Sequence, residues 1–139
     1  EKVEIVQFQT PDKSYETLEG MVTHVEGILQ KLELPYRILR LCGGDMGFAS
    51  ALTYDFEVYS AAQEKWLEVS SVSRFDTFQA NRLKLRFKDD KKTTLCHTLN
   101  GSALALPRIL ASLLENHQTA NGIQIPKALQ AYTGFSVIE

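Results

Sequence analysis

Three side chains with different chemistry lie within residues 98–108. Asn100 carries an amide, Ser102 a hydroxyl and Arg108 a guanidinium. The segment changes there from the alternation typical of a strand to the apolar spacing typical of a helix, so these residues flank one strand-to-helix junction. Amides and hydroxyls can hydrogen-bond a small polar ligand, and a guanidinium can bind a carboxylate or a phosphate with two parallel hydrogen bonds. The segment therefore predicts a site for a small anionic ligand.

A second polar cluster, Glu68-Val-Ser-Ser71, lies in an apolar run earlier in the chain, and Glu4 lies near the start. We expect both to share one substrate pocket with residues 98–108. In a regular strand, however, Glu68 and Ser71 point to opposite faces. Their convergence therefore requires a local twist or a β-bulge.

Each of these polar residues also has a simpler interpretation. Acidic residues on apolar strands, namely Glu4, Asp55, Glu57 and Glu68, face solvent more often than they perform chemistry. Arg108 could reach water from the edge of an apolar helix as readily as it could bind an anion. The alternating cations Arg82, Lys84, Arg86 and Lys88 indicate either a solvated strand face or a phosphate-binding surface.

The elements that must position these residues follow from apolar spacing and turn residues. Residues 1–8 alternate as a strand. A helix capped by Asp12 or Ser14 follows, because apolar residues recur at steps of three and four positions. Its apolar stripe comprises Tyr15, Leu18, Val22, Val25, Leu29 and Leu32. Strands are then predicted over residues 36–42, 53–59 and 66–72, with a glycine-rich loop over residues 43–47.

The second half of the chain shows the same kinds of signal. Residues 76–81 indicate a short helical turn capped by Asp76, and residues 82–88 and 94–99 indicate two paired strands. Ser102 is a candidate cap for a helix that settles between residues 103 and 107 and runs to His117. A short extended piece and a brief helix after Pro126 complete the chain. This order predicts one α+β domain over residues 1–139, with an antiparallel sheet flanked by helices.

The composition excludes several classes of function. The chain has 139 residues, 44% of them hydrophobic, and a net charge of −2, which gives no general attraction to nucleic acid or membranes. No apolar run approaches the ~18 residues needed to cross a bilayer, so we expect a soluble cytoplasmic protein. Cys42 and Cys96 have no partners at metal-ligand spacing, and we expect buried free thiols.

A set of motifs, taken together, is far more specific than any one of them. In chain order they are Lys2-Val-Glu4, Leu41-Cys-Gly-Gly-Asp-Met-Gly-Phe48, Tyr54-Asp-Phe-Glu-Val58, Glu68-Val-Ser-Ser71, Phe78-Gln-Ala-Asn-Arg82, Thr98-Leu-Asn-Gly-Ser102, Pro107-Arg108, Leu114-Glu-Asn116 and the segment from Pro126 to Gly134. This pattern resembles the C-terminal part of bacterial-type seryl-tRNA synthetases over essentially the whole chain. The resemblance implies an incomplete class II aminoacyl-tRNA synthetase core. It also implies a ligase that activates serine with ATP and transfers it to tRNA(Ser).

The resemblance implies a role for each matching residue. It places Glu4, Asn100 and Ser102 around serine, and Arg108 on the outer phosphates of ATP as the catalytic residue. It also places the segment from Glu68 through Val69 and Ser70 to Ser71 at ATP. Within that segment, Glu68 and Ser71 hold Mg²⁺ through the nucleotide.

The sequence departs from the family pattern at several positions. The usual Ser-Cys-Ser-Asn reads Ser71-Val-Ser-Arg74, and Gln-Ala-Arg-Arg reads Gln79-Ala-Asn-Arg82. The chain also begins after the family's α-phosphate arginine and adenine-stacking aromatic. We therefore expect residues 1–139 to be inactive alone, within a parent that forms a homodimer. The alternative hypothesis is a synthetase-derived RNA-binding module without catalysis.

Overall fold

The structure is a computed structural model and describes residues 1–90 and 92–139. The strands and helices, in chain order, are β1 (Lys2–Gln9), α1 (Ser14–Lys31), β2 (Tyr36–Arg40), β3 (Leu52–Ser60), β4 (Lys65–Arg74), α2 (Phe78–Leu83), β5 (Arg86–Asp89), β6 (Lys92–Leu95), β7 (His97–Ala105), α3 (Leu106–Asn116), β8 (Gln118–Thr119), β9 (Gly122–Gln124), α4 (Lys127–Thr133) and β10 (Val137–Ile138). A short 3₁₀ turn, Pro11–Lys13, precedes α1.

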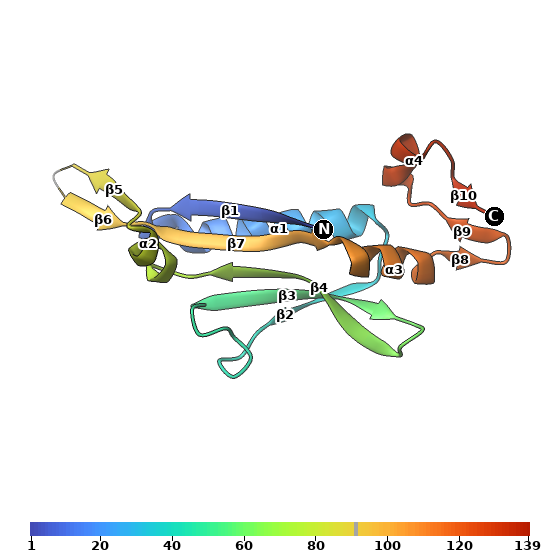
Figure 1. Cartoon of the computed structure of the whole chain (residues 1–139), viewed down its shortest axis with the longest axis horizontal. Coiled ribbons are helices and arrows are strands. Elements are labelled where there is room, and N and C mark those ends of the chain that lie inside the picture. Colours follow the sequence, from blue (N-terminus) through green and yellow to red (C-terminus); the bar gives the residue numbers. More distant parts are fainter. Residues whose placement is uncertain (91) are drawn as a thin grey trace.

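A five-stranded sheet in the order β1-β7-β4-β3-β2 forms the centre of the molecule. Each pair of neighbours in it is antiparallel. The β5–β6 hairpin projects beyond α2 at one end, and α3, α4 and the small sheet of β8, β9 and β10 lie at the other (Figure 1). The predicted α+β architecture with an antiparallel sheet is confirmed.

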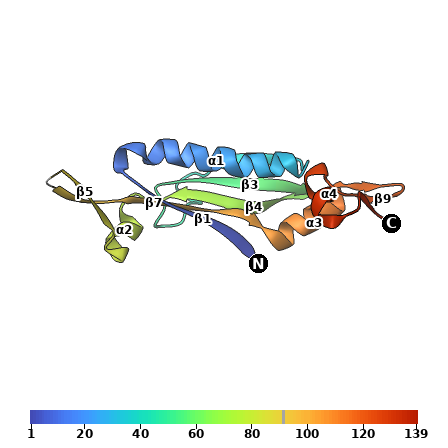
Figure 2. The ribbon, with the colours of Figure 1, turned by 90° about the horizontal axis from the view of Figure 1, so that it is seen from above.

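Helix α1 packs along one face of this sheet (Figure 2). Its predicted apolar stripe is confirmed apart from Tyr15, which is 57% exposed, and Met21 completes the buried face. Residues of α1, β3, β4 and β7 form one apolar core, which includes Leu18, Val25, Leu29, Phe56, Val58, Val69, Val72 and Leu99. Because burial of apolar surface is the main favourable term in folding, this contact fixes which face of the sheet is sealed.

The other face of the sheet displays the alternate residues of the same strands. Glu4 lies opposite Ser102, and Asn100 lies opposite Ser73. Directly opposed residues point to the same face of a sheet, so these side chains share the side away from α1. We call this side the open face. Figure 2 shows α2 and α3 at its two ends.

Two predictions for residues 76–88 were wrong. Helix α2 begins at Phe78 with Thr77 as its N-cap, so Asp76 caps nothing. The first two residues of the predicted strand over residues 82–88 are helical, because α2 continues to Leu83 and Lys84 ends it in the left-handed conformation with φ 56°. Strand β5 starts only at Arg86. The alternating cations therefore do not form one strand face.

Neither serine predicted to cap a helix does so. Ser102 lies inside β7, and α3 follows Ala105 without a side-chain cap. The predicted start between residues 103 and 107 is confirmed, with Pro107 tolerated in the first turn. Ser14 begins α1, but its hydroxyl is fully buried and donates to the Pro11 carbonyl at 2.9 Å.

Arg74 is buried where β4 ends, and its contacts account for its departure from the family pattern. Its Nε lies 3.1 Å from Asp76 Oδ1, and its guanidinium lies 3.5 Å from the centre of the Tyr15 ring. It also donates a hydrogen bond of 3.3 Å to Ser14 Oγ. A buried cation needs such partners. Arg74 therefore ties the end of β4 to the start of α1.

His97 completes this cluster but forms no catalytic triad with it. Its Nδ1 lies 2.8 Å from Ser14 Oγ and 3.5 Å from Asp76 Oδ1. In a triad the histidine is the base and contacts the nucleophile hydroxyl and the carboxylate through different ring nitrogens, whereas both contacts here involve Nδ1. Burial lowers the pKa of His97, which favours a neutral structural imidazole. Of the two thiols, Cys96 is buried as predicted, whereas Cys42 is exposed.

Gly101 lies where β4 and β7 approach most closely, so its replacement tests the fold. A Cβ atom there would lie 2.7 Å from Val72 Cγ2 and 3.1 Å from the Ser71 carbonyl oxygen. We expect Gly101→Ala to lower the free energy of unfolding by about 1–3 kcal/mol, measured by urea denaturation. Gly27→Ala is the matched control, because nothing lies within 4 Å of its Cβ and alanine favours the helix. Equal stability of the two variants would contradict this account.

Candidate functional site

Strand β4 contains a one-residue bulge at Val69. Glu68 lies opposite Glu57 of β3, whereas Ser70 lies opposite Phe56, so Val69 is the extra residue. The Val69 side chain is fully buried in the core beneath α1. Bulges of this kind change the direction of the side chains that follow them.

The bulge places Glu68 and Ser71 on the same face. Ser71 lies opposite Asp55, and Glu68 lies opposite Glu57. Asp55 and Glu57 are two positions apart on β3 and therefore point the same way. The sequence predicted that convergence of Glu68 and Ser71 would require a bulge, and this prediction is confirmed.

Glu4 and Ser102 meet across β1 and β7. The Ser102 hydroxyl donates a hydrogen bond of 3.2 Å to Glu4 Oε2. The same carboxylate oxygen lies 2.9 Å from the ammonium group of Lys2. Glu4 is thus positioned to accept from a hydroxyl and an ammonium group at once. The pair with Lys2 is largely exposed, so it holds Lys2 only weakly.

Asn100 is joined to helix α2. Its Nδ2 donates to Gln79 Oε1 at 3.2 Å, and the Thr98 hydroxyl donates to the same oxygen at 2.7 Å. Gln79 therefore fixes the amide of Asn100 on the open face. Reasoning from single residues missed this role of Gln79, although the residue lies in one of the motifs that carry the family resemblance.

Arg108 reaches from the first turn of α3 to the bulge in β4. Its guanidinium donates a hydrogen bond to the main-chain carbonyl of Glu68, and the side chain is exposed. This contact engages the backbone and leaves the Glu68 carboxylate in solvent. The guanidinium and that carboxylate therefore lie at the same end of the sheet.

A cavity of about 490 Å³ lies between these groups. Its lining comprises Glu1, Lys2, Glu68, Val69, Ser70, Ser102, Ala105, Pro107 and Arg108. Glu4 is joined to it through Ser102. Ser71 and Asn100 lie on the open face but are not part of this lining. Its size is within the usual range for small-ligand sites.

Ser70 and Val69 border this cavity, although both residues are almost fully buried. Ser70 is 1% exposed, and its hydroxyl donates to the Ser102 carbonyl at 2.6 Å. That bond holds β4 against β7. The hydroxyl of Ser70 and the buried isopropyl group of Val69 therefore serve the fold.

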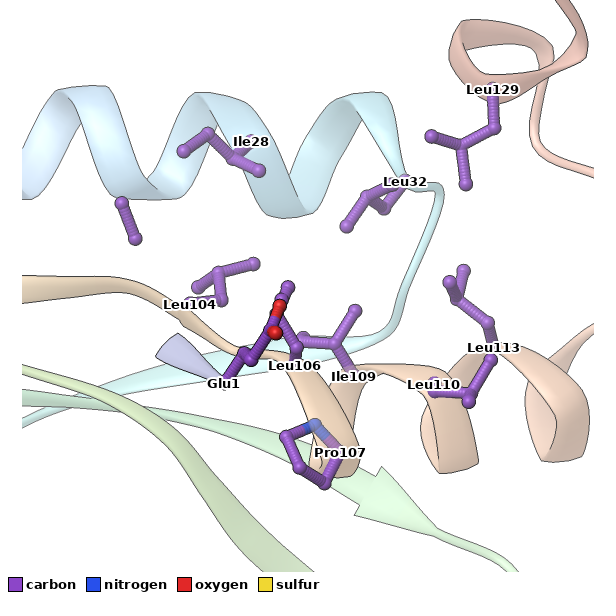
Figure 3. A pocket seen from close by; sticks show the side chains of 11 residues that line it. Glu1, Ile28, Leu32, Leu104, Leu106, Pro107, Ile109, Leu110, Leu113 and Leu129 are labelled. Carbon is purple, nitrogen blue, oxygen red and sulfur yellow. The ribbon is translucent and has the colours of Figure 1, made fainter. Parts of the chain in front are cut away.

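A larger cavity, of about 640 Å³, lies elsewhere. It is bounded by the ends of α1 and β7 and by α3 and α4, and apart from Glu1 its lining is apolar (Figure 3). Leu104, Ile109, Leu113 and Leu129 contribute to it. The described lining has no cation that could hold a phosphate, and Glu1 is its one polar side chain, so we exclude this cavity as the ATP and serine site.

Asp55 is a half-buried acid that the predicted site did not include. It lies beside Ser71 on the open face, and within the described residues its Oδ1 has no hydrogen-bond partner. Burial raises the pKa of Asp55, and a hydrogen bond from Ser71 acts in the opposite direction. Nearby Glu57 and Asp45 raise this pKa further. The only sequence signal was an acid within an apolar strand.

The chain is similar to a known protein family. The model of the tRNA synthetase class II core domain (G, H, P, S and T) matches residues 1–117. The chain belongs to this family. The expected class II synthetase core is confirmed.

In sequence, this class II core is similar to serine–tRNA ligases. It is 60% identical over 136 residues to the serine–tRNA ligase of Neisseria meningitidis serogroup B, covering 96% of this chain and 32% of that protein. It is 54% identical to the enzyme of Salinibacter ruber, covering 99% of this chain and 33% of that protein. The resemblance to bacterial seryl-tRNA synthetases is therefore confirmed, and the chain spans about a third of the length of these relatives.

Solved structures agree with the sequence comparison. The class II core superposes on seryl-tRNA synthetase from Pyrococcus horikoshii complexed with ATP, with a TM-score of 0.93 and 41% identity. That match covers 99% of this chain and 32% of the other. The cytoplasmic serine–tRNA ligase of Naegleria fowleri in complex with AMP gives a TM-score of 0.91 at 29% identity, covering 99% and 33% of the two chains. In the described part of this chain, no helix has the length and apolarity required to cross a membrane.

The charge of Asp55 predicts how stability depends on pH. Its folded pKa lies above the ordinary value of 3.8, so the ionised form costs stability once the pH exceeds that folded pKa. Below 3.8 both the folded and the unfolded chain hold the proton, and this cost disappears. We expect Asp55→Asn to unfold at a higher temperature than the wild type at about pH 7, with the difference shrinking as the pH falls.

Thermal denaturation at several pH values checks this expectation. Glu16→Gln on the exposed surface of α1 controls for the loss of one negative charge. A lower melting temperature for Asp55→Asn near neutral pH would count against a destabilising buried carboxylate.

Proposed function

We propose that the chain supplies part of the catalytic domain of a serine–tRNA ligase. In this reaction the serine carboxylate attacks the α-phosphate of ATP, forming seryl-adenylate and releasing pyrophosphate. A terminal ribose hydroxyl of tRNA(Ser) then attacks the seryl carbonyl and releases AMP. The observation that carries the proposal is the meeting of Glu68, Ser102 and Arg108 in one cavity, with Glu4 bonded to Ser102.

Glu4 and Ser102 are suited to hold serine. A carboxylate binds an ammonium group by charge-assisted hydrogen bonds, and Glu4 already accepts from Lys2 in this way. A serine substrate would displace that exposed lysine. The amide of Asn100, fixed by Gln79, and the hydroxyl of Ser102 are suited to bind the serine hydroxyl. An analogue without the hydroxyl would leave these groups unpaired, which favours serine over alanine.

Arg108 is suited to hold the outer phosphates of ATP. Its planar guanidinium offers several donors in a fixed geometry, and its exposed position leaves donors available beyond the bond to the Glu68 carbonyl. A cation there would stabilise charge that develops on the leaving pyrophosphate. We therefore assign Arg108 as the catalytic residue of this chain.

Glu68 and Ser71 fit the magnesium ion that ATP carries. Both offer hard oxygen atoms, and the bulge at Val69 turns both to one face. Within the described residues, no group of three or more acidic, histidine or cysteine side chains could hold a metal ion. Magnesium commonly takes one or two protein ligands and completes its shell with water and phosphate, so this sparse set agrees with an ion held through ATP. Bound there, Mg²⁺ would neutralise phosphate charge.

The same proposal specifies the partners and the location. It implies serine and tRNA(Ser) as substrates, a homodimer of the complete enzyme, and the cytoplasm, where tRNA is charged. The alternative of an RNA-binding module without catalysis is less favoured, because such a module has no need for the serine and ATP residues of the cavity.

A chimera tests the proposed function. Residues 1–139 would replace the corresponding third of the Neisseria meningitidis enzyme, to which they are 60% identical. We expect serine-dependent exchange of pyrophosphate into ATP within about tenfold of the donor enzyme. Residues 1–139 alone should give none, because the described lining of the cavity holds a single arginine and no aromatic side chain to stack on adenine. A folded chimera without exchange would refute the proposal.

Arg108→Ala in this chimera tests the phosphate contact. Loss of charge-assisted hydrogen bonds worth about 1.5–3 kcal/mol should lower kcat/KM for ATP by roughly 10- to 150-fold, with a smaller effect on KM for serine. Arg37→Ala, on the edge strand β2 and paired with Glu57, is the matched control. If both variants retained the same exchange rate, the assignment of Arg108 would be wrong.

A further inference from the structure

An exposed aromatic and cationic cluster lies at the end of the sheet opposite α3. Phe48 is 94% exposed, and its ring meets that of Phe78 edge to face, with centroids 5.6 Å apart and planes at 79°. The guanidinium of Arg82 lies 3.5 Å from the centre of the Phe78 ring. We call Phe48, Phe78 and Arg82 the α2 platform.

The arrangement of these groups leaves Phe48 available to a ligand. Arg82 covers one face of Phe78 and is held there by a hydrogen bond of 3.0 Å to the Phe78 carbonyl. The ring of Phe48 contacts the ring of Phe78, and 94% of Phe48 is nevertheless exposed to solvent. A phenyl ring this exposed is unfavourable in water and suited to stacking on another flat, apolar surface.

A cavity of about 480 Å³ adjoins the α2 platform. Phe78 and Arg82 line it together with polar side chains that could bond the edge of a planar heterocycle, namely Asp76, Thr77 and Asn81. Such a mixture of aromatic, amide and charged groups matches a nucleobase better than it matches an apolar ligand.

Further cations lie at the end of α2 and on the β5–β6 hairpin, which projects beyond that helix (Figure 1). Those with exposed side chains are Lys84, Arg86, Lys88 and Lys92. Asp90 in the turn and Asp76 in the cavity are acids on this part of the molecule, so the charge is locally positive rather than uniform. A positive surface next to an aromatic ring is the combination that binds unpaired nucleic acid, with phosphates on the cations and bases on the ring.

The same helix connects the α2 platform to the serine side of the open face. Gln79 follows Phe78 and accepts hydrogen bonds from Thr98 and Asn100 of β7. A strand of RNA lying on the platform would therefore enter the open face from the end opposite Arg108.

We propose that the α2 platform binds the unpaired end of an RNA substrate, with one base stacked on Phe48 and the adjoining phosphates held by Arg82 and the hairpin cations. This inference rests on the proposed function, in which the seryl group passes to a terminal ribose. It assigns to residues outside the serine and ATP cavity the task of holding that terminus.

Binding of RNA by the chain itself tests the inference. A fluorescent single-stranded RNA of about ten nucleotides and a blunt duplex of the same length would be titrated by anisotropy. We expect single strands to bind more tightly than the duplex, and Phe48→Ala to weaken the single strand about tenfold. Arg82→Gln should weaken it as well and reduce the salt dependence. Tyr132→Ala, an 87% exposed aromatic on α4 at the other end of the molecule, is the matched control.

The outcomes separate this inference from the proposed function. Equal binding of RNA by wild type and Phe48→Ala, or equal binding of duplex and single strand, overturns the α2 platform. In the chimera, the ratio of seryl transfer to pyrophosphate exchange should fall in Phe48→Ala and stay constant in Tyr132→Ala. Absence of exchange in the unmodified chimera refutes the proposed function, whereas a Phe48-dependent RNA affinity in residues 1–139 would still support the surface.

Discussion

The single extra residue at Val69 is the constraint on which the candidate site depends. Without it, β4 would alternate regularly from Glu68 to Ser71, and one of the two would point into the core beneath α1. With it, Val69 is the residue whose side chain is buried in the core, and Glu68 and Ser71 both remain on the open face. Side chains alternate along each strand. The same alternation therefore buries apolar residues beneath α1 and displays polar residues on the open face.

The junction between β7 and α3 contributes residues to two parts of the candidate site, because β7 runs along the open face and α3 follows it directly. At its start, Thr98 and Asn100 are bonded to α2, and near its end Ser102 is bonded to β1. Helix α3 then begins immediately and carries Arg108 back to β4. One continuous segment therefore links the proposed RNA-binding surface, the proposed serine position and the proposed phosphate position, and small shifts in β7 would affect all three.

Much of this arrangement could be predicted from sequence, and the remainder depends on contacts that a linear pattern does not contain. Apolar spacing identified α1 and the central strands, because each buries one face against the same core. The contacts of Arg74 could not be predicted. Its cluster with Tyr15, Asp76 and His97 forms only through tertiary folding. The alternating cations from Arg82 to Lys88 were misassigned because α2 continues through the first of them, and tertiary contacts outweigh a short local pattern. Gln79 and Asp55 were missed for a related reason, as their roles depend on neighbours from other strands.

The contact between Arg108 and the main-chain carbonyl of Glu68 has a consequence for how this site can vary. Every residue at position 68 would present the same carbonyl, so the anchor of the guanidinium does not depend on which side chain is there. The carboxylate can therefore change during evolution or design without releasing the arginine. The two neighbouring tasks are in this sense genetically separable, although they occupy the same end of the sheet.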